Sequence, residues 1–400
     1  MNILIFEYCF DDAGHRVPYA SLIAQAIVAA GHDIVVAFPS KIRNSDSINE
    51  YFHASEELAA NSVGIHFFET SVCNSAREKA KQIVRDFDAV VNEIQPDYAI
   101  VPTGDLFAIA CAMEQFVWFK NRVSRIPIDV LLMRGDFAYR HNRTFTRIVK
   151  RLKWWMSARL KWHRLSVLDP IVWQLEKENM PELELCPDPV PPKPNLDKLS
   201  ARHELGLPPD GKILISVGNQ NETKGVDLLL RAFSSEPSNS NHFLVLVGPM
   251  TRRVQEVFNL CSTHTNIISI NRFVSESEFQ RALLSADVVA VPYRKTDRPS
   301  GIICRCVAWG IPILGSNTGW PNWACEKYSA GIAVDIRNRK QFVEAINNSL
   351  EHSDDFKRSQ EAATFCRFNS ESNFKKFWTA GIKADSAGYE PLEPVARIEK

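Results

Sequence analysis

The chain of 400 residues is 45% hydrophobic and carries no formal net charge at pH 7. This length and apolar content suffice for two domains, each with its own hydrophobic core. A neutral balance excludes attraction of nucleic acid by the protein as a whole, so any anion site must be local. The nine cysteines include no C-x-x-C pair and therefore predict reduced, mostly buried thiols rather than a disulfide framework or a zinc site.

The first half of the chain alternates apolar runs with helical patterns. ILIFEYCF reads as a strand, and the charges of Asp11 and Asp12 interrupt it too early for a signal peptide or a membrane span, so we expect a cytoplasmic protein. A helix ending at Gly31 follows, then the strands HDIVVAFP and IHFFET, a helix over 75–94 and the strand PDYAIVPTGD. This order predicts a doubly wound α/β sheet. Its ligand-facing loops would contain Gly14, Gly104 and Gly135.

Residues 140–164 differ in composition from the rest of the chain. They contain nine Lys or Arg, three Trp and no Asp or Glu. On a helix, Ile148, Leu152, Trp155 and Met156 share one face with basic residues around them, as in a helix that lies on an anionic membrane surface. An ordinary cationic helix whose apolar stripe packs on its own domain would give the same pattern. Nucleic acid is a third, less favoured option because no recognised motif accompanies the basic residues.

A proline-rich segment divides the chain. CPDPVPPKPN, residues 186–195, has five prolines in ten positions and can continue neither a helix nor a central strand. We therefore predict an N-terminal Rossmann-like domain over 1–185, a linker over 186–198 and a second Rossmann-like domain over 199–370. A C-terminal helix within 371–400 is expected to pack back toward the N-terminal domain, followed by a tail.

Two strand–loop–helix units in the second half are of the type that faces phosphate. In KILISVGNQNETKGVDLLLRAF, Lys224 and Gly225 stand where the helix begins. In ADVVAVPYRKTDRPSGIICRCVAWGIPILGS, Ser300 is expected to cap the helix N-terminus and Gly301 to allow close approach of a ligand. A helix N-terminus at the carboxyl edge of a parallel sheet favours an anion.

These motifs resemble the glycosyltransferase family 4 (group 1) type of GT-B enzymes. The DPV linker, GNxxxxKG, NRFVSESEF and the ADVVAVPY to ILGS stretch occur in that family's order and spacing. The resemblance implies two facing Rossmann-like domains, with a nucleotide-sugar donor lying mainly against the C-terminal one. It also implies retention of anomeric configuration and no metal or other cofactor.

Carried over to this chain, the family's donor motif is altered. Gly218 and Lys224 match the G-R-x-x-x-x-K-G loop, whereas Asn219 replaces the arginine that contacts the diphosphate. The family's two glutamates fall on Asp297, which can keep a sugar contact, and on Arg305, which cannot accept from ribose hydroxyls. We infer that Arg305 supplies the diphosphate charge lost at Asn219. The resemblance adds these donor contacts: Ser300, Gly301 and Ile302 at the helix start, and the backbone of Arg272, Phe273 and Val274 beside the base.

The N-terminal half matches the family only in outline. Gly14, His15 and Arg16 form the first strand-to-helix loop, which in the family approaches the phosphates and the acceptor; helix capping is an equally weighted role for His15. The family's histidine near the sugar falls on Met133 or Arg134. Arg134 and Asp136 are therefore expected to contact sugar or acceptor, with plain loop charges as the alternative.

The function implied is transfer of a sugar from a nucleoside diphosphate to an acceptor hydroxyl, with retention, in glycan or cell-envelope polysaccharide synthesis. Lys224, the amides near Ser300 and Gly301, and Arg305 would stabilise the departing diphosphate, with Asp297 on the sugar. The acceptor is expected to be a glycan or a lipid-linked sugar, and residues 140–164 would hold the protein at the inner face of a membrane. A catalytically inactive GT-B homologue that serves as a binding or partner subunit is the alternative; an epimerase or phosphorylase is less favoured.

Overall fold

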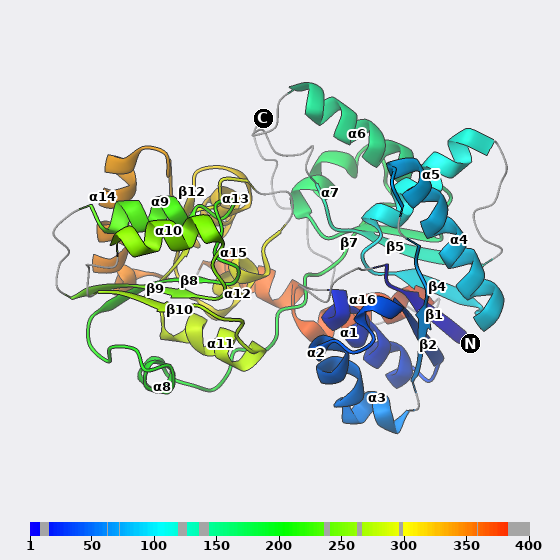
Figure 1. Cartoon of the computed structure of the whole chain (residues 1–400), viewed down its shortest axis with the longest axis horizontal. Coiled ribbons are helices and arrows are strands. Elements are labelled where there is room, and N and C mark those ends of the chain that lie inside the picture. The colour runs from blue at the N-terminus through cyan, green and yellow to red at the C-terminus, as the bar shows by residue number, and fades with distance from the viewer. Residues whose placement is uncertain are drawn as a thin grey trace. The chain divides into compact units, whose positions relative to one another are not determined.

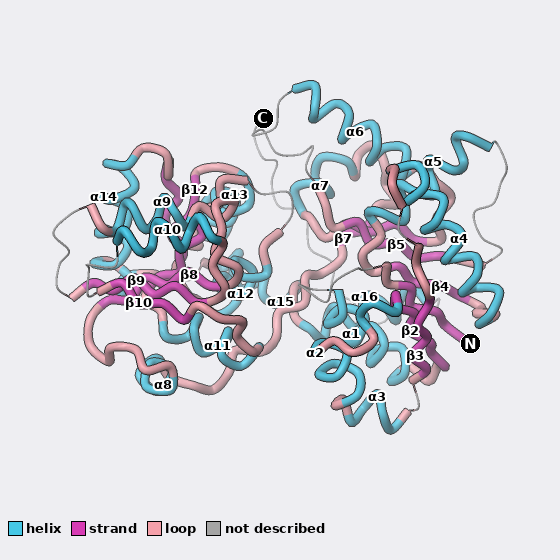
Figure 2. Tube along the Cα trace, in the orientation of Figure 1, coloured by secondary structure: helices cyan, strands magenta, loops and turns pink. Residues whose placement is uncertain are grey.

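The computed structural model describes residues 1–8, 16–61, 63–71, 73–118, 126–135, 144–235, 241–261, 266–295, 299–357 and 359–382. They form two compact units. The N-terminal unit contains the described residues up to Pro189 together with α16 (Glu371–Ile382), and the C-terminal unit contains those in Val190–Ser370. Each unit is an α/β layer structure built on one parallel sheet (Figures 1 and 2).

The N-terminal sheet has seven parallel strands in the order β3-β2-β1-β4-β5-β6-β7. In β1, the four residues from Ile3 to Phe6 are apolar and fully buried because helices cover both faces of the sheet. The order reverses between β1 and β4, which makes that point the topological switch of this sheet. The strands are β1 (Asn2–Phe6), β2 (Asp33–Pro39), β3 (Gly64–Phe68), β4 (Tyr98–Val101), β5 (Ile128–Leu132), β6 (Arg164–Val167) and β7 (Glu184–Leu185).

Helices on both faces complete the N-terminal unit. Figure 1 shows α1 and α16 together on one face, and α4 and α5 on the other. The guanidinium of Arg164 stacks on Phe377 and Trp378 of α16, with its carbon 4.3 Å and 5.1 Å from the ring centres, and so fixes α16 to this unit. The helices are α1 (Arg16–Ala29), α2 (Asp46–Ile48), α3 (Glu56–Ala60), α4 (Ala76–Ile94), α5 (Asp105–Trp118), α6 (Thr144–Ala158) and α7 (Pro170–Glu176).

The C-terminal sheet has six parallel strands in the order β10-β9-β8-β11-β12-β13, with its switch point between β8 and β11. The strands are β8 (Lys212–Val217), β9 (His242–Val247), β10 (Ile267–Ile270), β11 (Val288–Val291), β12 (Ile313–Ser316) and β13 (Gly331–Val334). Helices again cover both faces (Figure 2). They are α8 (Lys198–Glu204), α9 (Val226–Phe233), α10 (Arg252–Cys261), α11 (Glu276–Ser285), α12 (Gly301–Trp309), α13 (Gly319–Tyr328), α14 (Arg339–Glu351) and α15 (Gln360–Phe368).

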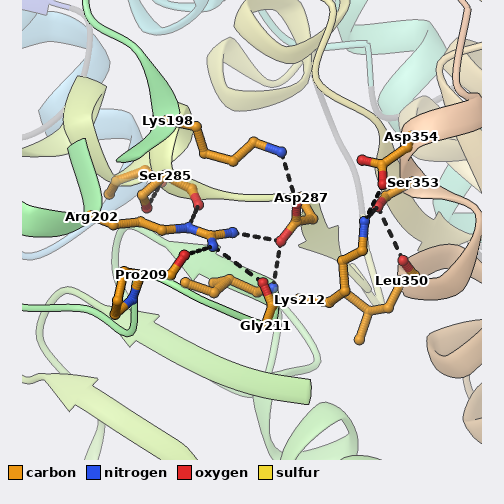
Figure 3. Close-up of polar contacts among 12 residues, drawn as sticks. Lys198, Arg202, Pro209, Gly211, Lys212, Ser285, Asp287, Leu350, Ser353 and Asp354 are labelled. Carbon is orange, nitrogen blue, oxygen red and sulfur yellow. Dashed lines mark hydrogen bonds and ion pairs between the residues drawn. The ribbon is translucent and has the colours of Figure 1, made fainter. Parts of the chain in front are cut away.

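A buried ionic cluster holds the amino edge of this second sheet. Asp287, directly before β11, accepts from the backbone N–H of Ile213 and from Arg202 Nη2, both at 2.6 Å, and pairs with Lys198 Nζ at 2.7 Å (Figure 3). Arg202 also donates to the carbonyls of Ser285, Pro209 and Gly211. Because Asp287 and Arg202 are both buried and hydrogen-bonded, this cluster anchors α8 to the sheet. In parallel α/β sheets, ligands bind at the opposite edge, where the strands have their carboxyl ends.

The doubly wound α/β class predicted from the sequence is confirmed for both halves. The first elements differ in length from the prediction, since β1 ends at Phe6 and α1 already begins at Arg16. Pro18 lies in the first turn of α1, where the missing N–H would have had no intrahelical partner. The eight cysteines in the described ranges are all free, and four of them are buried.

Candidate functional site

The loop between β8 and α9 brings a lysine over a glycine. A β-carbon built on Gly218 would lie 2.8 Å from Lys224 Nζ, so the ammonium sits directly above the end of β8. Gly218 and Gly225 have φ of +90° and +71°, and a β-carbon on Gly225 would lie only 2.0 Å from the Pro292 carbonyl oxygen. Both positions therefore require glycine, which explains the GNxxxxKG spacing physically. The backbone N–H of Lys224 donates to Asn221 Oδ1 at 2.9 Å.

The side chain of Gln220 holds this loop in shape. It is fully buried, and its Nε2 donates to the carbonyls of Ser216, Gly218 and Val247, while its Oε1 accepts from the Ser216 hydroxyl at 2.9 Å. Sequence reasoning missed Gln220, because nothing in the N-Q-N run distinguishes the one buried amide from its neighbours. Asn219, which replaces the expected arginine, is exposed.

Lys224 has unusual electrostatics for a lysine. Its side chain is half-buried, and burial lowers its pKa to about 8. The ammonium stands near the N-terminus of α9, where the helix dipole disfavours a cation. An anion bound beside it would remove both penalties, so this geometry suits a phosphate or another anionic group.

The start of α12 lies next to the same loop. Ile302 Cδ1 is 3.7 Å from the β-carbon position of Gly218, which brings Gly218, Lys224 and the first turn of α12 together. The expectation that Ser300 caps this helix through its side chain is wrong. The Ser300 hydroxyl instead lies 3.2 Å from the hydroxyl of buried Tyr293, so Ser300 does not occupy the first N–H groups of α12.

Arg294 ties the two loops to each other. Its backbone N–H donates to the Thr223 carbonyl at 2.9 Å and its Nη1 to the Glu222 carbonyl at 3.1 Å. Its Nη2 pairs with Asp227 Oδ2 on α9 at 2.7 Å. Sequence reasoning missed Arg294 too, because its partners lie some 70 residues earlier in the chain. The carboxyl ends of β8 and β11 thus form one preorganised edge at the switch point.

Arg305 is engaged with a neighbouring helix. Its Nη1 lies 2.8 Å from Oε1 of Glu276, which is the first residue of α11. Its guanidinium carbon lies 4.9 Å from the centre of the Phe279 ring. The side chain is 19% exposed. An arginine has five N–H donors, so this ion pair leaves room for further bonds but holds the group toward α11.

The segment after β10 presents an aromatic side chain. Phe273 is 80% exposed, whereas Val274 is half-buried. Arg272 pairs with Glu278 through both terminal nitrogens, at 2.5 Å and 3.1 Å, and this bond lowers the pKa of the Glu278 carboxyl to about 2. The pair fixes the turn that exposes Phe273.

Only some of the expected N-terminal residues can be placed. Arg16 is the first residue of α1, and Arg134 is exposed after β5, where the N–H groups of Met133 and Arg134 donate to Asp105. Gly14, His15, Asp136 and Asp297 lie outside the described residues. The N-terminal and C-terminal candidates belong to different units.

A buried carboxyl lies at the switch point of the N-terminal sheet. Glu7, directly after β1, is fully buried and accepts from the hydroxyl of Thr103, which follows β4. Burial raises the pKa of Glu7 to about 7, with Arg16 and Asp105 acting in opposite directions on it. Sequence reasoning treated Glu7 as part of a strand, because the run ILIFEYCF gives no sign that its one charge lies at a strand end.

Metal-ligating side chains do not gather in the described ranges: no group of three or more His, Cys, Asp or Glu there could hold a metal ion.

Comparison with known proteins places the second unit in context. The sequence model of the family "Glycosyl transferases group 1" matches residues 197–364. The chain is 26% identical over 145 residues to the lipopolysaccharide core biosynthesis glycosyltransferase LpsE of Rhizobium meliloti, which covers 36% of this chain and 41% of that protein. The chain spans between 32% and 41% of the length of the curated relatives it matches.

Solved structures resemble the chain over nearly its whole length. Sucrose-phosphate synthase from Thermosynechococcus elongatus has a TM-score of 0.69 at 14% identity, covering 96% of this chain and 97% of that one. Anabaena Alr3699/HepE in complex with UDP and glucose has a TM-score of 0.67 at 12% identity, covering 96% and 100%. At such identities the likeness concerns the fold, and it confirms the GT-B class predicted from the sequence.

Proposed function

We propose that this protein transfers a sugar from a nucleoside diphosphate to an acceptor hydroxyl, because residues 197–364 match the sequence model of the group 1 glycosyltransferases. The observation that carries the proposal is the position of the Lys224 ammonium, which lies above Gly218 and beside the first turn of α12. A half-buried lysine with a lowered pKa at the switch point of a parallel sheet is a site for an anion.

The diphosphate of the donor would lie at this edge. The Lys224 ammonium and the first backbone N–H groups of α12 would stabilise the negative charge that develops as the sugar leaves. Gln220 and Arg294 hold the two loops without needing to touch the ligand. The exposed ring of Phe273 offers a flat apolar surface on which a base can stack.

The reaction we propose retains the configuration of the sugar. The bond from the anomeric carbon to the diphosphate oxygen breaks, its electron pair stays on the diphosphate, and the acceptor oxygen attacks the same face of an oxocarbenium-like centre. The acceptor proton passes to the departing diphosphate, which balances the step without a carboxylate nucleophile. We propose that no metal takes part.

Arg305 remains our candidate for the second cation on the diphosphate. Arg305 pairs with Glu276, so contact with the diphosphate would require Arg305 to share or exchange this partner. Asn219 and Asp297 remain proposals for the donor side as well. Gly14, His15, Arg16, Arg134 and Asp136 remain proposals for the sugar or acceptor side.

The acceptor we propose is a glycan or a lipid-linked sugar, with a role in glycan or cell-envelope polysaccharide synthesis. The similarity to a lipopolysaccharide core glycosyltransferase supports this choice.

Thermal shifts with UDP, GDP, ADP and dTDP test the donor site. A nucleotide at about 100 times its dissociation constant adds roughly 2.7 kcal/mol of stability. We expect one nucleotide to raise the melting temperature of the wild type and of Lys340→Ala, a control at an exposed lysine on α14, but not of Lys224→Ala. With the matching nucleotide sugar, Lys224→Ala should lose roughly 2–4 kcal/mol of transition-state stabilisation, and EDTA should leave wild-type turnover unchanged. Near-normal turnover of Lys224→Ala would refute its role.

An inactive homologue that serves as a binding or partner subunit is the second candidate. The Arg305–Glu276 ion pair favours an inactive homologue, because Arg305 is the cation that would have to replace the arginine missing at Asn219 and it is already paired with a carboxylate. No thermal shift with any of the four nucleotides, for wild type and Arg305→Ala alike, would support this reading. A shift that Arg305→Ala abolishes would support the enzyme with Arg305 on the phosphates.

A further inference from the structure

The outward side of α6 is apolar, contrary to what a solvent-facing helix requires. Ile148, Val149, Leu152 and Trp155 have exposed fractions of 61%, 37%, 53% and 44%. Positions 148, 152 and 155 follow the spacing that aligns side chains along one helix face. We infer that this face of α6 docks on the surface of a membrane that contains anionic lipids. The inference stands on α6 alone and does not depend on the proposed transferase activity.

The other side of α6 already serves the core of the N-terminal unit. Trp154, Ser157 and Ala158 are buried, and α6 packs on α5 (Figure 1). At about 100° per residue, the mean direction of these three side chains differs by roughly 130° from that of Ile148, Leu152 and Trp155. The exposed stripe and the core-facing side are therefore two different sides of α6. Ile148, Leu152 and Trp155 of the predicted stripe are therefore not packed on the described part of the unit, whereas Met156 is half-buried.

Cations border the exposed stripe. Lys153 and Arg159 are exposed, and the Arg159 guanidinium carbon lies 4.4 Å from the centre of the Trp155 ring. Arg151 is also exposed and pairs with Glu176 of α7 through one nitrogen at 2.9 Å. No Asp or Glu occurs in residues 140–164. The face thus combines an apolar centre with a rim of a single sign of charge, which is complementary to lipid headgroups above acyl chains.

Other partners fit this face less well. A nucleic acid would pair with the cations but would not require three large apolar side chains between them. A protein interface does not require a rim of one sign of charge. An isolated exposed apolar residue, such as Leu260 on α10 with 75% exposure, is ordinary. Indole and arginine side by side are suited to the interface between headgroups and acyl chains.

The helix would lie on the membrane rather than cross it. Within the described ranges, no helix combines the length and the apolar content that a bilayer crossing requires. An interfacial helix buries its apolar side to a depth of about 5–10 Å, which side chains of the size of Leu152 and Trp155 can reach. Attachment of this kind is reversible and depends on both apolar burial and charge.

Flotation of the full-length protein with vesicles tests the inference. We expect binding to phosphatidylcholine vesicles that contain about 30 mol% phosphatidylglycerol, weak binding to phosphatidylcholine alone, and loss of most binding at about 0.5 M salt. Leu152→Ser should lower the partition coefficient about tenfold through lost apolar burial. Lys153→Gln should lower it about fivefold through lost charge attraction.

Matched controls lie on the other unit. Leu260→Ser removes a leucine that is 75% exposed, against 53% for Leu152, and Lys340→Gln removes another exposed lysine, so both should bind vesicles like the wild type. Absence of wild-type flotation at every lipid composition would overturn the inference, as expected if a protein partner covers α6. Equal loss in Leu152→Ser and Leu260→Ser would also overturn it. Flotation in the absence of any nucleotide-induced thermal shift would leave this inference intact and refute only the proposed reaction.

Discussion

The ammonium nitrogen of Lys224 lies 2.8 Å from the point that a β-carbon on Gly218 would occupy. Gly218→Ala must therefore push the ammonium away from the end of β8, and it also places a side chain at a φ of +90°. We expect the variant to lose about 1–2 kcal/mol of folding stability from backbone strain. Nucleotide affinity should fall about tenfold or more. Urea unfolding and nucleotide titration measure the two effects; unchanged affinity would show that the Lys224 position does not matter.

Lys224 should make the stability of the ligand-free protein depend on alkaline pH. Burial lowers its pKa from 10.5 to about 8, so folding disfavours the charged form. The resulting cost is complete below pH 8 and disappears as the pH rises from about 8 to 10.5. At pH 7, Lys224→Met should therefore melt about 2–4 °C above the wild type, and the gap should close by pH 10.5. Melting curves across this range test it. A variant that melts below the wild type at pH 7 would contradict the assignment.

Glu7 should destabilise the fold as the pH rises from about 4.5 to about 7. Burial raises its pKa from 4.5 to about 7, so the folded state binds the proton more tightly than the unfolded state does. The stabilisation is complete below pH 4.5 and is lost progressively up to about pH 7. The advantage of Glu7→Gln over wild type should therefore grow by roughly 2–3 kcal/mol between pH 5 and pH 8. Urea unfolding at both pH values measures this difference, with exposed Glu182→Gln as the control.

The ionic cluster at the amino edge of the second sheet should matter for stability and not for binding. Asp287→Ala would leave buried Arg202 without its carboxylate, at a cost of about 3–5 kcal/mol. Lys198→Ala removes the half-exposed partner of the same carboxylate and should cost below about 1 kcal/mol. Both should bind nucleotide like the wild type under conditions in which they are folded. Denaturant unfolding and nucleotide titration separate these effects; weakened binding in folded Asp287→Ala would contradict the separation of the two edges.

Local patterns in the sequence were enough for the architecture. Apolar runs bounded by glycine and proline predict buried parallel strands, and their alternation with helical periods predicts two doubly wound sheets, because strand and helix periodicities are properties of neighbouring residues. The same holds for Lys224, whose place at the start of α9 follows from the strand, the loop length and Gly225. The strands, the helices and the position of Lys224 at a helix start could therefore be predicted from the sequence alone.

Only the tertiary structure decided which groups these elements bring together. Ser300 faces Tyr293 instead of its own helix, Arg305 meets Glu276 of another helix, and Gln220 is buried beneath the loop that it shapes. Periodicity grouped Ile148, Leu152 and Trp155 on one face, but it could not tell whether that face looks inward or outward. These outcomes depend on how different elements pack against one another, as Arg305 of α12 packs against Glu276 of α11, and helix and strand periodicities carry no information about such contacts.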